Sequence, residues 1–130
     1  MATYPVNVTR DSGLWVAEVD GLPPGTIGVT DVQRFADLGS EVRDLVAGLT
    51  QADPTSFKLT WRYVIDEQDV TSLFEAVFGA ELAYRAAAAA RDAARQAVIR
   101  TLDEADVPQS AIGDLLGLSH QRVSQLIKAG

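Results

Sequence analysis

The alternation of apolar and polar residues in the first half of the chain predicts a small β-sheet. Residues 4–9 and 14–19 alternate with the period of a half-buried strand, and the Asp-Ser-Gly sequence at 11–13 predicts a hairpin turn between them. A short third strand is expected over residues 26–29, after a loop that contains two prolines and two glycines. The strictest alternation covers residues 57–65, where every second residue is apolar.

Helices are predicted where apolar residues recur at steps of three or four. The first helix should begin at a capping box formed by Thr30 and Gln33 and run to about Leu49. Its apolar stripe comprises Val32, Phe35, Leu38, Val42, Leu45, Val46 and Leu49. A short helix is expected over residues 70–78, and a longer one, rich in alanine and arginine, over residues 81–105.

The end of the chain, residues 109–130, predicts two short helices joined by a tight turn. Pro108 should take the first position of the first of these helices. Gly113 lets the two helices pass close to each other, and Gly117 suits a left-handed turn residue. We expect a shared core of Ile112, Leu116, Leu118, Val123 and Leu126, packed against Val98, Ile99 and Leu102 of the preceding helix. This pattern is typical of a helix-turn-helix.

The outward face of the last helix carries side chains that can reach the edges of DNA bases. Ser119 should cap the helix, and His120, Gln121 and Gln125 should lie near its groove-facing end, with Ser124 beside them. Glutamine can form two hydrogen bonds with adenine, and serine can bond to several bases. These residue types therefore favour direct readout in the major groove.

Three further residues are better suited to phosphates, which position a protein on DNA without specifying sequence. They are Gln109, Arg122 and Lys128. The complete candidate DNA-binding set is Gln109, Ser119, His120, Gln121, Arg122, Ser124, Gln125 and Lys128. The alternative is a helical hairpin that only packs or dimerises.

These elements predict an α+β protein in which an N-terminal β-β-β-α-β sheet-helix domain is followed by an all-α helix-turn-helix domain. We assign residues 1–66 to a partner-binding sheet-helix domain, residues 67–94 to a helical connector, and residues 95–130 to the DNA-binding domain.

The charge of the chain is unevenly distributed, which bears on its partners. The net charge is −7, and residues 1–79 hold 5 basic and 12 acidic residues, whereas residues 80–130 hold 6 of each. Residues 119–130 carry two basic side chains and no acidic one. A single copy should bind DNA weakly, and a homodimer or higher homo-oligomer would strengthen binding. The acidic first half suits a basic partner.

Several classes of function are disfavoured by what the sequence contains. With no cysteine, disulfides and thiolate metal sites cannot form, which suits the cytoplasm. We see no secretory signal and no apolar run of the ~18 residues that a membrane helix requires. His120 is the only histidine, and its neighbour Ser119 cannot face it on a helix. We therefore expect no catalytic residue, no metal and no cofactor.

A series of short motifs in the first half resembles the N-terminal domain of HicB-type antitoxins. The motifs are Tyr-Pro-Val-Asn-Val-Thr at 4–9, Gly-Leu-Trp-Val-Ala-Glu-Val at 13–19 and Gly-Leu-Pro-Pro-Gly at 21–25, followed by a strand ending Val-Thr-Asp at 29–31 and an amphipathic helix. The resemblance covers about residues 3–65, and the family adds a DNA-binding domain that is either ribbon-helix-helix or helix-turn-helix.

The resemblance implies a partial double-stranded-RNA-binding fold that binds a small basic, RNA-cutting toxin and covers its active site. It also implies repression of the family's own operon by dimers or higher assemblies bound to operator DNA. The sequence departs from the family in its long alanine-rich stretch from Glu81 and in Asp20-Gly21, where the family has a proline-containing step.

Two other functions remain open at this stage. The chain could be a stand-alone helix-turn-helix transcriptional regulator whose first domain dimerises or senses a ligand. It could also bind RNA through its first domain, although the acidic balance of that domain opposes this. An enzyme is the least favoured class.

Overall fold

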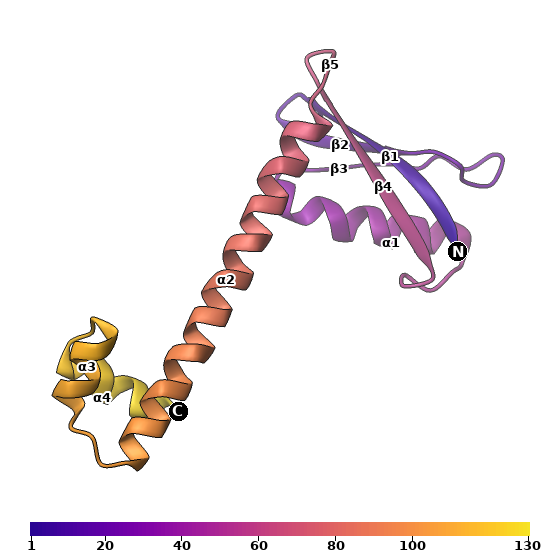
Figure 1. Cartoon of the computed structure of the whole chain (residues 1–130). Coiled ribbons are helices and arrows are strands. Elements are labelled where there is room, and N and C mark those ends of the chain that lie inside the picture. Colours follow the sequence, from indigo (N-terminus) through magenta and orange to yellow (C-terminus); the bar gives the residue numbers. More distant parts are fainter. The chain divides into compact units, whose positions relative to one another are not determined.

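The computed structural model describes residues 1–130 and shows a mixed α+β protein with a five-stranded sheet and four α-helices. In chain order the elements are β1 (Ala2–Asp11), β2 (Leu14–Val19), β3 (Val29–Val32), the 3-10 helix η1 (Phe35–Asp37), α1 (Leu38–Thr50), β4 (Phe57–Ile65), β5 (Gln68–Asp69), α2 (Thr71–Glu104), α3 (Gln109–Leu116) and α4 (His120–Ala129) (Figure 1). The chain divides into an N-terminal unit, Met1–Val77, and a C-terminal unit, Phe78–Gly130.

The sheet of the N-terminal unit is built around β1, in the strand order β3-β2-β1-β4-β5. β1 pairs antiparallel with β2 and parallel with β4, and α1 lies in the connection that the parallel pair requires. The predicted hairpin is confirmed, with Ser12 and Gly13 at positive φ (51° and 79°) between β1 and β2. Positive φ at both turn residues matches the twist of the flanking strands.

One face of this sheet forms the core of the N-terminal unit, and α1 covers it (Figure 1). Leu38, Val42 and Val46 of α1 are almost completely buried, as are Val6 and Val8 of β1. The buried core also includes Ala17, Val19, Phe57 and Tyr63. The opposite face is more polar, with exposed residues Thr9, Lys58, Thr60 and Arg62, although it also carries the half-buried Val16, which pairs with Thr9. The strict alternation predicted for residues 57–65 is thus confirmed, with the apolar side turned inward.

The predicted third strand and first helix are displaced along the chain. The strand lies at Val29–Val32 rather than at residues 26–29, and the capping box predicted at Thr30 is wrong because Thr30 pairs with Ala17 of β2. A strand's ladder of hydrogen bonds satisfies more backbone groups than one local cap. The helical region begins at η1, so Val32 and Phe35 contact the core from outside α1.

A hairpin that the sequence did not predict follows β4. Asp66 and Glu67 both have positive φ (51° and 64°), and β5 pairs with Val64 and Ile65 beyond this turn. The helices predicted separately over residues 70–78 and 81–105 form one continuous helix, α2. Gly79 therefore does not interrupt the helix.

Candidate nucleic-acid interface

The turn between α3 and α4 depends on two glycines. Gly117 ends α3 in the left-handed conformation (φ 68°), and its N–H donates to the Gly113 carbonyl. The Leu118 N–H donates to the same carbonyl at 2.9 Å. A Cβ at Gly113 would lie 2.5 Å from the Leu118 carbonyl oxygen, closer than a carbon atom can approach. The prediction for Gly117 is confirmed, whereas the close approach at Gly113 is to Leu118 in the turn and not to α4, as had been expected.

The start of α3 differs in detail from the prediction. Pro108 has extended backbone angles (φ −59°, ψ 146°) and occupies the N-cap position rather than the first position of the helix. Its carbonyl accepts hydrogen bonds from the N–H groups of Ala111 (3.0 Å) and Ile112 (3.1 Å). Proline is tolerated here because its missing N–H would have no helical partner.

A small apolar core holds α3 and α4 against the end of α2. Its buried residues are Ile99 of α2, Ile112 of α3 and Val123 of α4, one from each helix. Six partly buried residues pack around them: Leu102, Val107, Leu116, Leu118, Leu126 and Ile127. The predicted packing is confirmed for Ile99 and Leu102. Val98, the third α2 residue expected there, is half-buried and lies outside this core.

Ser119 caps the start of α4, as expected. Its backbone is extended (φ −69°, ψ 155°), and its hydroxyl oxygen accepts a hydrogen bond from the Arg122 N–H at 3.1 Å. This cap fixes where the helix begins and leaves the N–H groups of its first turn pointing out of the helix end. The hydroxyl is an acceptor in this cap, so Ser119 acts first as a structural residue.

The outward side of α4 forms a shallow polar concavity. Its lining residues are His120, Gln121, Ser124, Gln125 and Lys128, a set that contains one basic side chain and no carboxylate. All are exposed except Ser124, which is half-buried. The structure thus brings five of the eight sequence-predicted residues onto one continuous surface.

The other three predicted residues lie at the edges of this surface or beside it. Gln109, at the start of α3, joins it through a 2.8 Å hydrogen bond between its Oε1 and the His120 Nε2. Arg122 is exposed on α4 but does not line the concavity, and its guanidinium contacts the Gln125 Oε1 at 3.5 Å. The Gln109–His120 contact was not predicted, because it depends on how α3 crosses α4.

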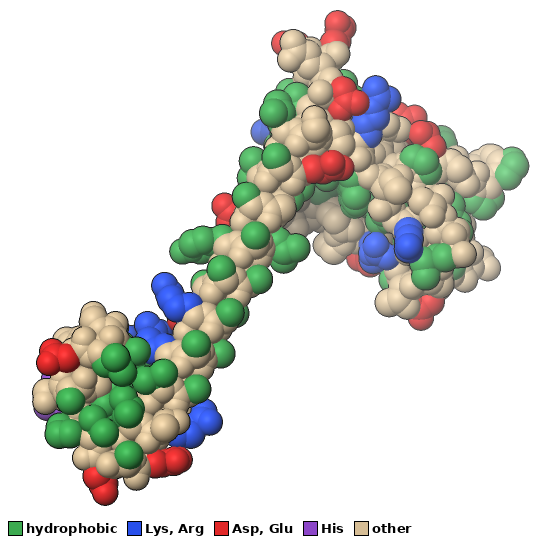
Figure 2. All heavy atoms as spheres, viewed as in Figure 1, with side chains coloured by type: hydrophobic (Ala, Val, Ile, Leu, Met, Phe, Trp, Pro, Cys, Tyr) green, Lys and Arg blue, Asp and Glu red, His purple; other side chains and the backbone are tan.

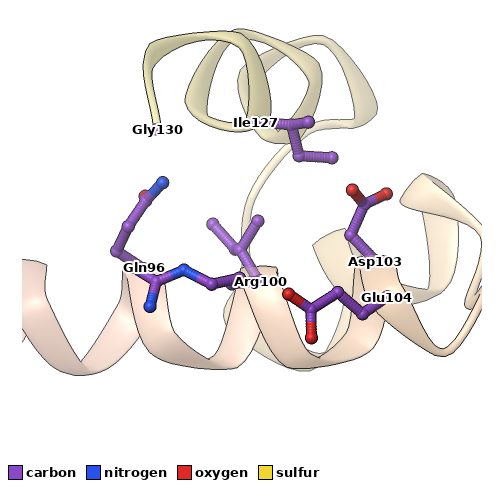
Figure 3. Close-up of a pocket in the computed structure, with 7 residues that line it drawn as sticks. Gln96, Arg100, Asp103, Glu104, Ile127 and Gly130 are labelled. Atoms are coloured by element: carbon purple, nitrogen blue, oxygen red, sulfur yellow. The ribbon is translucent and has the colours of Figure 1, made fainter.

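A second hollow lies between α2 and the end of α4 (Figure 3), and it shares no lining residue with the polar concavity. Its volume is about 210 Å³, and its lining includes Arg100, Asp103 and Glu104 of α2. Gln96 points from α2 toward the end of α4 and donates to the Leu126 carbonyl at 3.1 Å. This bond ties α4 to α2, and no local sequence pattern predicts it.

No cluster of histidine and acidic side chains has the arrangement needed to hold a metal ion. None of the helices is both long enough and apolar enough to cross a membrane. The perturbed carboxylates belong to local turns: Asp69 accepts hydrogen bonds from the Thr71 N–H and the Arg62 Nε, both at 3.0 Å, and chiefly the bonds from Thr71 lower its pKa to about 2. These bonds join β4 and β5 to the start of α2.

Comparison with known proteins gives no assignment, since no protein-family model, curated protein or solved structure matches the chain.

Proposed function

We propose that this protein is a sequence-specific DNA-binding regulator that inserts α4 into the major groove. The observation that carries the proposal is the polar concavity on α4, which stands on a compact apolar core and contains no carboxylate. A short helix held by a glycine turn and a preceding helix is the arrangement with which helix-turn-helix proteins present side chains to bases.

The side chains on this surface suggest a division of roles. Gln121 and Gln125 are exposed amides that can bond to adenine through two hydrogen bonds. Arg122 and Lys128 are exposed cations without a carboxylate partner within ion-pair distance in the described structure, so both are available to phosphates. The Gln109–His120 bond would hold His120 in place beside the groove.

We also propose that the regulator is of the HicB antitoxin type, with the finer layout of a β-β-β-α-β domain followed by a helix-turn-helix domain. Support comes from the motifs at residues 4–9, 13–19 and 21–25 and from the charge of the N-terminal unit. That unit contains 12 acidic and 5 basic residues, a balance that attracts a small basic toxin and repels nucleic acid. The alternative is a stand-alone regulator without a toxin.

Substitutions on α4 test the DNA-binding proposal. Gln121→Ala should weaken binding by on the order of 1–3 kcal/mol at a base position it reads and relax specificity there. Arg122→Ala should weaken binding to all sequences alike and reduce the slope of log K against log salt by about 1. Gel-shift titrations on an operator series at several salt concentrations measure both. If Gln121→Ala weakened binding equally on every sequence, Gln121 would not read a base. If Arg122→Ala left the salt slope unchanged, Arg122 would not contact a phosphate.

The neighbouring gene distinguishes the antitoxin from the stand-alone regulator. If it encodes a short basic protein that arrests growth, co-expression of this chain should restore growth, and the two proteins should purify together. A toxic neighbour that this chain neither binds nor neutralises would leave the DNA-binding proposal in place and remove the antitoxin part.

A further inference from the structure

One face of α2 carries large apolar side chains that are exposed to solvent. Leu73, Val77 and Tyr84 are 68%, 59% and 73% exposed, which is unusual for residues of this size so close together. They belong to a series whose steps alternate between four and three residues, and which we call the heptad face: Leu73, Val77, Ala80, Tyr84, Ala87, Arg91, Ala94 and Val98. Alternating steps of three and four residues are the pattern of helices that pair along their length.

The heptad face is asymmetric along the helix, because its exposed large apolar side chains, Leu73, Val77 and Tyr84, all lie in its first half. Beside its last residues, Ala94 and Val98, the surface is hollowed against α3. One hollow is lined by these two residues with Arg91, Arg95 and Leu116, and the other by Ala97, Val98, Thr101, Leu102 and Leu115. Figure 2 shows apolar side chains projecting from the middle of α2 and gathered on the C-terminal unit. One end of the face thus protrudes and the other is recessed.

Charges on and beside the heptad face are also asymmetric. Glu81 lies toward its start, and Arg91 and Arg95 lie toward its end. Arg91 contacts Asp92 at 3.2 Å, but its side chain is 70% exposed, so this surface pair holds it only weakly. If two copies paired in parallel, each Arg91 would meet the other in the seam, and like charges would repel. In an antiparallel pair, Arg91 of one copy meets Glu81 of the other.

We propose that the heptad face binds the heptad face of a second copy of this chain in an antiparallel helix pair. In the register that centres between Tyr84 and Ala87, two of the large residues oppose alanines: Tyr84 meets Ala87, and Val77 meets Ala94. Leu73 of one copy then enters the apolar hollows beside Val98 of the other. The same register places Arg91 of one copy opposite Ala80 of the other. Its guanidinium then bonds to Glu81, the neighbour of that Ala80.

This pairing goes beyond the proposed function and does not depend on it, because the contact uses no residue of the polar concavity on α4. The oligomeric state of the chain is measured without DNA. Loss of the dimer and loss of DNA readout are therefore separate results.

Matched leucine substitutions test which face of α2 makes the contact. Leu73 and Leu82 are 68% and 69% exposed on the same helix, but only Leu73 belongs to the heptad face. In sedimentation velocity of the full chain, wild type should be dimeric. Leu73→Gln should raise the dimer Kd by about tenfold or more, because each dimer loses two buried leucines, whereas Leu82→Gln should leave it unchanged. Circular dichroism checks that both variants keep their helix content.

Cysteine cross-linking tests the direction of the pair, because the chain has no native cysteine. Val77→Cys and Ala94→Cys should form a disulfide-linked dimer when the two variants are mixed and oxidised. Neither should cross-link alone, because in the antiparallel register the two copies of each residue lie about 25 Å apart along the axis. In a parallel pair each variant would cross-link with itself and the mixture would give no additional product.

Three results would overturn the proposal. A wild-type chain that stays monomeric up to millimolar concentration removes the interface. A dimer weakened by Leu82→Gln and not by Leu73→Gln places the contact on another face. Disulfides within each single-cysteine variant, or none in the mixture, exclude the antiparallel register.

Discussion

At the scale of single residues, backbone conformations and helix caps that involve only neighbouring residues were predictable from the sequence. Gly117 and Ser119 have the conformations that their positions in the predicted turn and cap require. The Gln109–His120 bond and the Gln96–Leu126 bond were not predictable, since their partners are 11 and 30 residues apart. Such contacts depend on helix crossing angles, which no local pattern specifies.

Substitution of Gly113 tests the close approach in the turn. Gly113→Ala should destabilise the C-terminal unit by about 1–3 kcal/mol, because the added Cβ would meet the backbone oxygen of Leu118. The control is Gly79→Ala in α2, where a Cβ meets nothing within 4 Å and alanine should stabilise the helix by about 0.5–1 kcal/mol. Urea unfolding followed by circular dichroism measures both changes in the free energy of unfolding. If both substitutions stabilised, or both destabilised, the close approach at Gly113 would not explain its effect.

At the scale of elements, sequence patterns succeeded where one signal acted without a competitor. The strands at Leu14–Val19 and Phe57–Ile65 have the bounds that their alternation predicted. The capping box at Thr30 failed because β2 offered the same backbone groups a ladder of partners. β5 was missed because it has only two residues, and because the turn before it, Asp66-Glu67, adopts positive φ without the glycine that usually signals such a turn.

The junction of β5 with α2 should make stability depend on pH in acid. Folding lowers the pKa of Asp69 from 3.8 to about 2, chiefly through hydrogen bonds from Thr71 and further through Arg62. A lowered carboxyl pKa adds stability above pH 3.8, and this contribution is lost as the pH falls toward 2. Asp69→Asn should therefore be less stable than wild type at neutral pH, and the difference should shrink between pH 4 and pH 2. Urea titrations of both proteins across that range measure it, and a constant difference would remove Asp69 as the titrating group.

At the scale of the whole molecule, the fold class was predictable but the sheet order was not. The parallel pairing of β1 with β4 joins segments about half the chain apart, and neither strand carries a local sign of its partner. Surface assignments at this scale were also partly predictable. The polar face of α4 followed from helical spacing, whereas the recessed end of the heptad face depends on the place of α3 against α2.

The two units have separate buried cores, so a cavity made in one core should leave the stability of the other unchanged. Val46 and Val123 form a matched pair, because both are 0% exposed and lie in different cores. Val46→Ala should lower the free energy of unfolding of the N-terminal unit by about 2 kcal/mol, and Val123→Ala should do the same for the C-terminal unit. In each case the transition temperature of that unit falls with it. Differential scanning calorimetry of the full chain should resolve two transitions that shift independently. A single transition lowered equally by both substitutions would mean that the chain unfolds as one cooperative body, and would contradict the independence of the two cores.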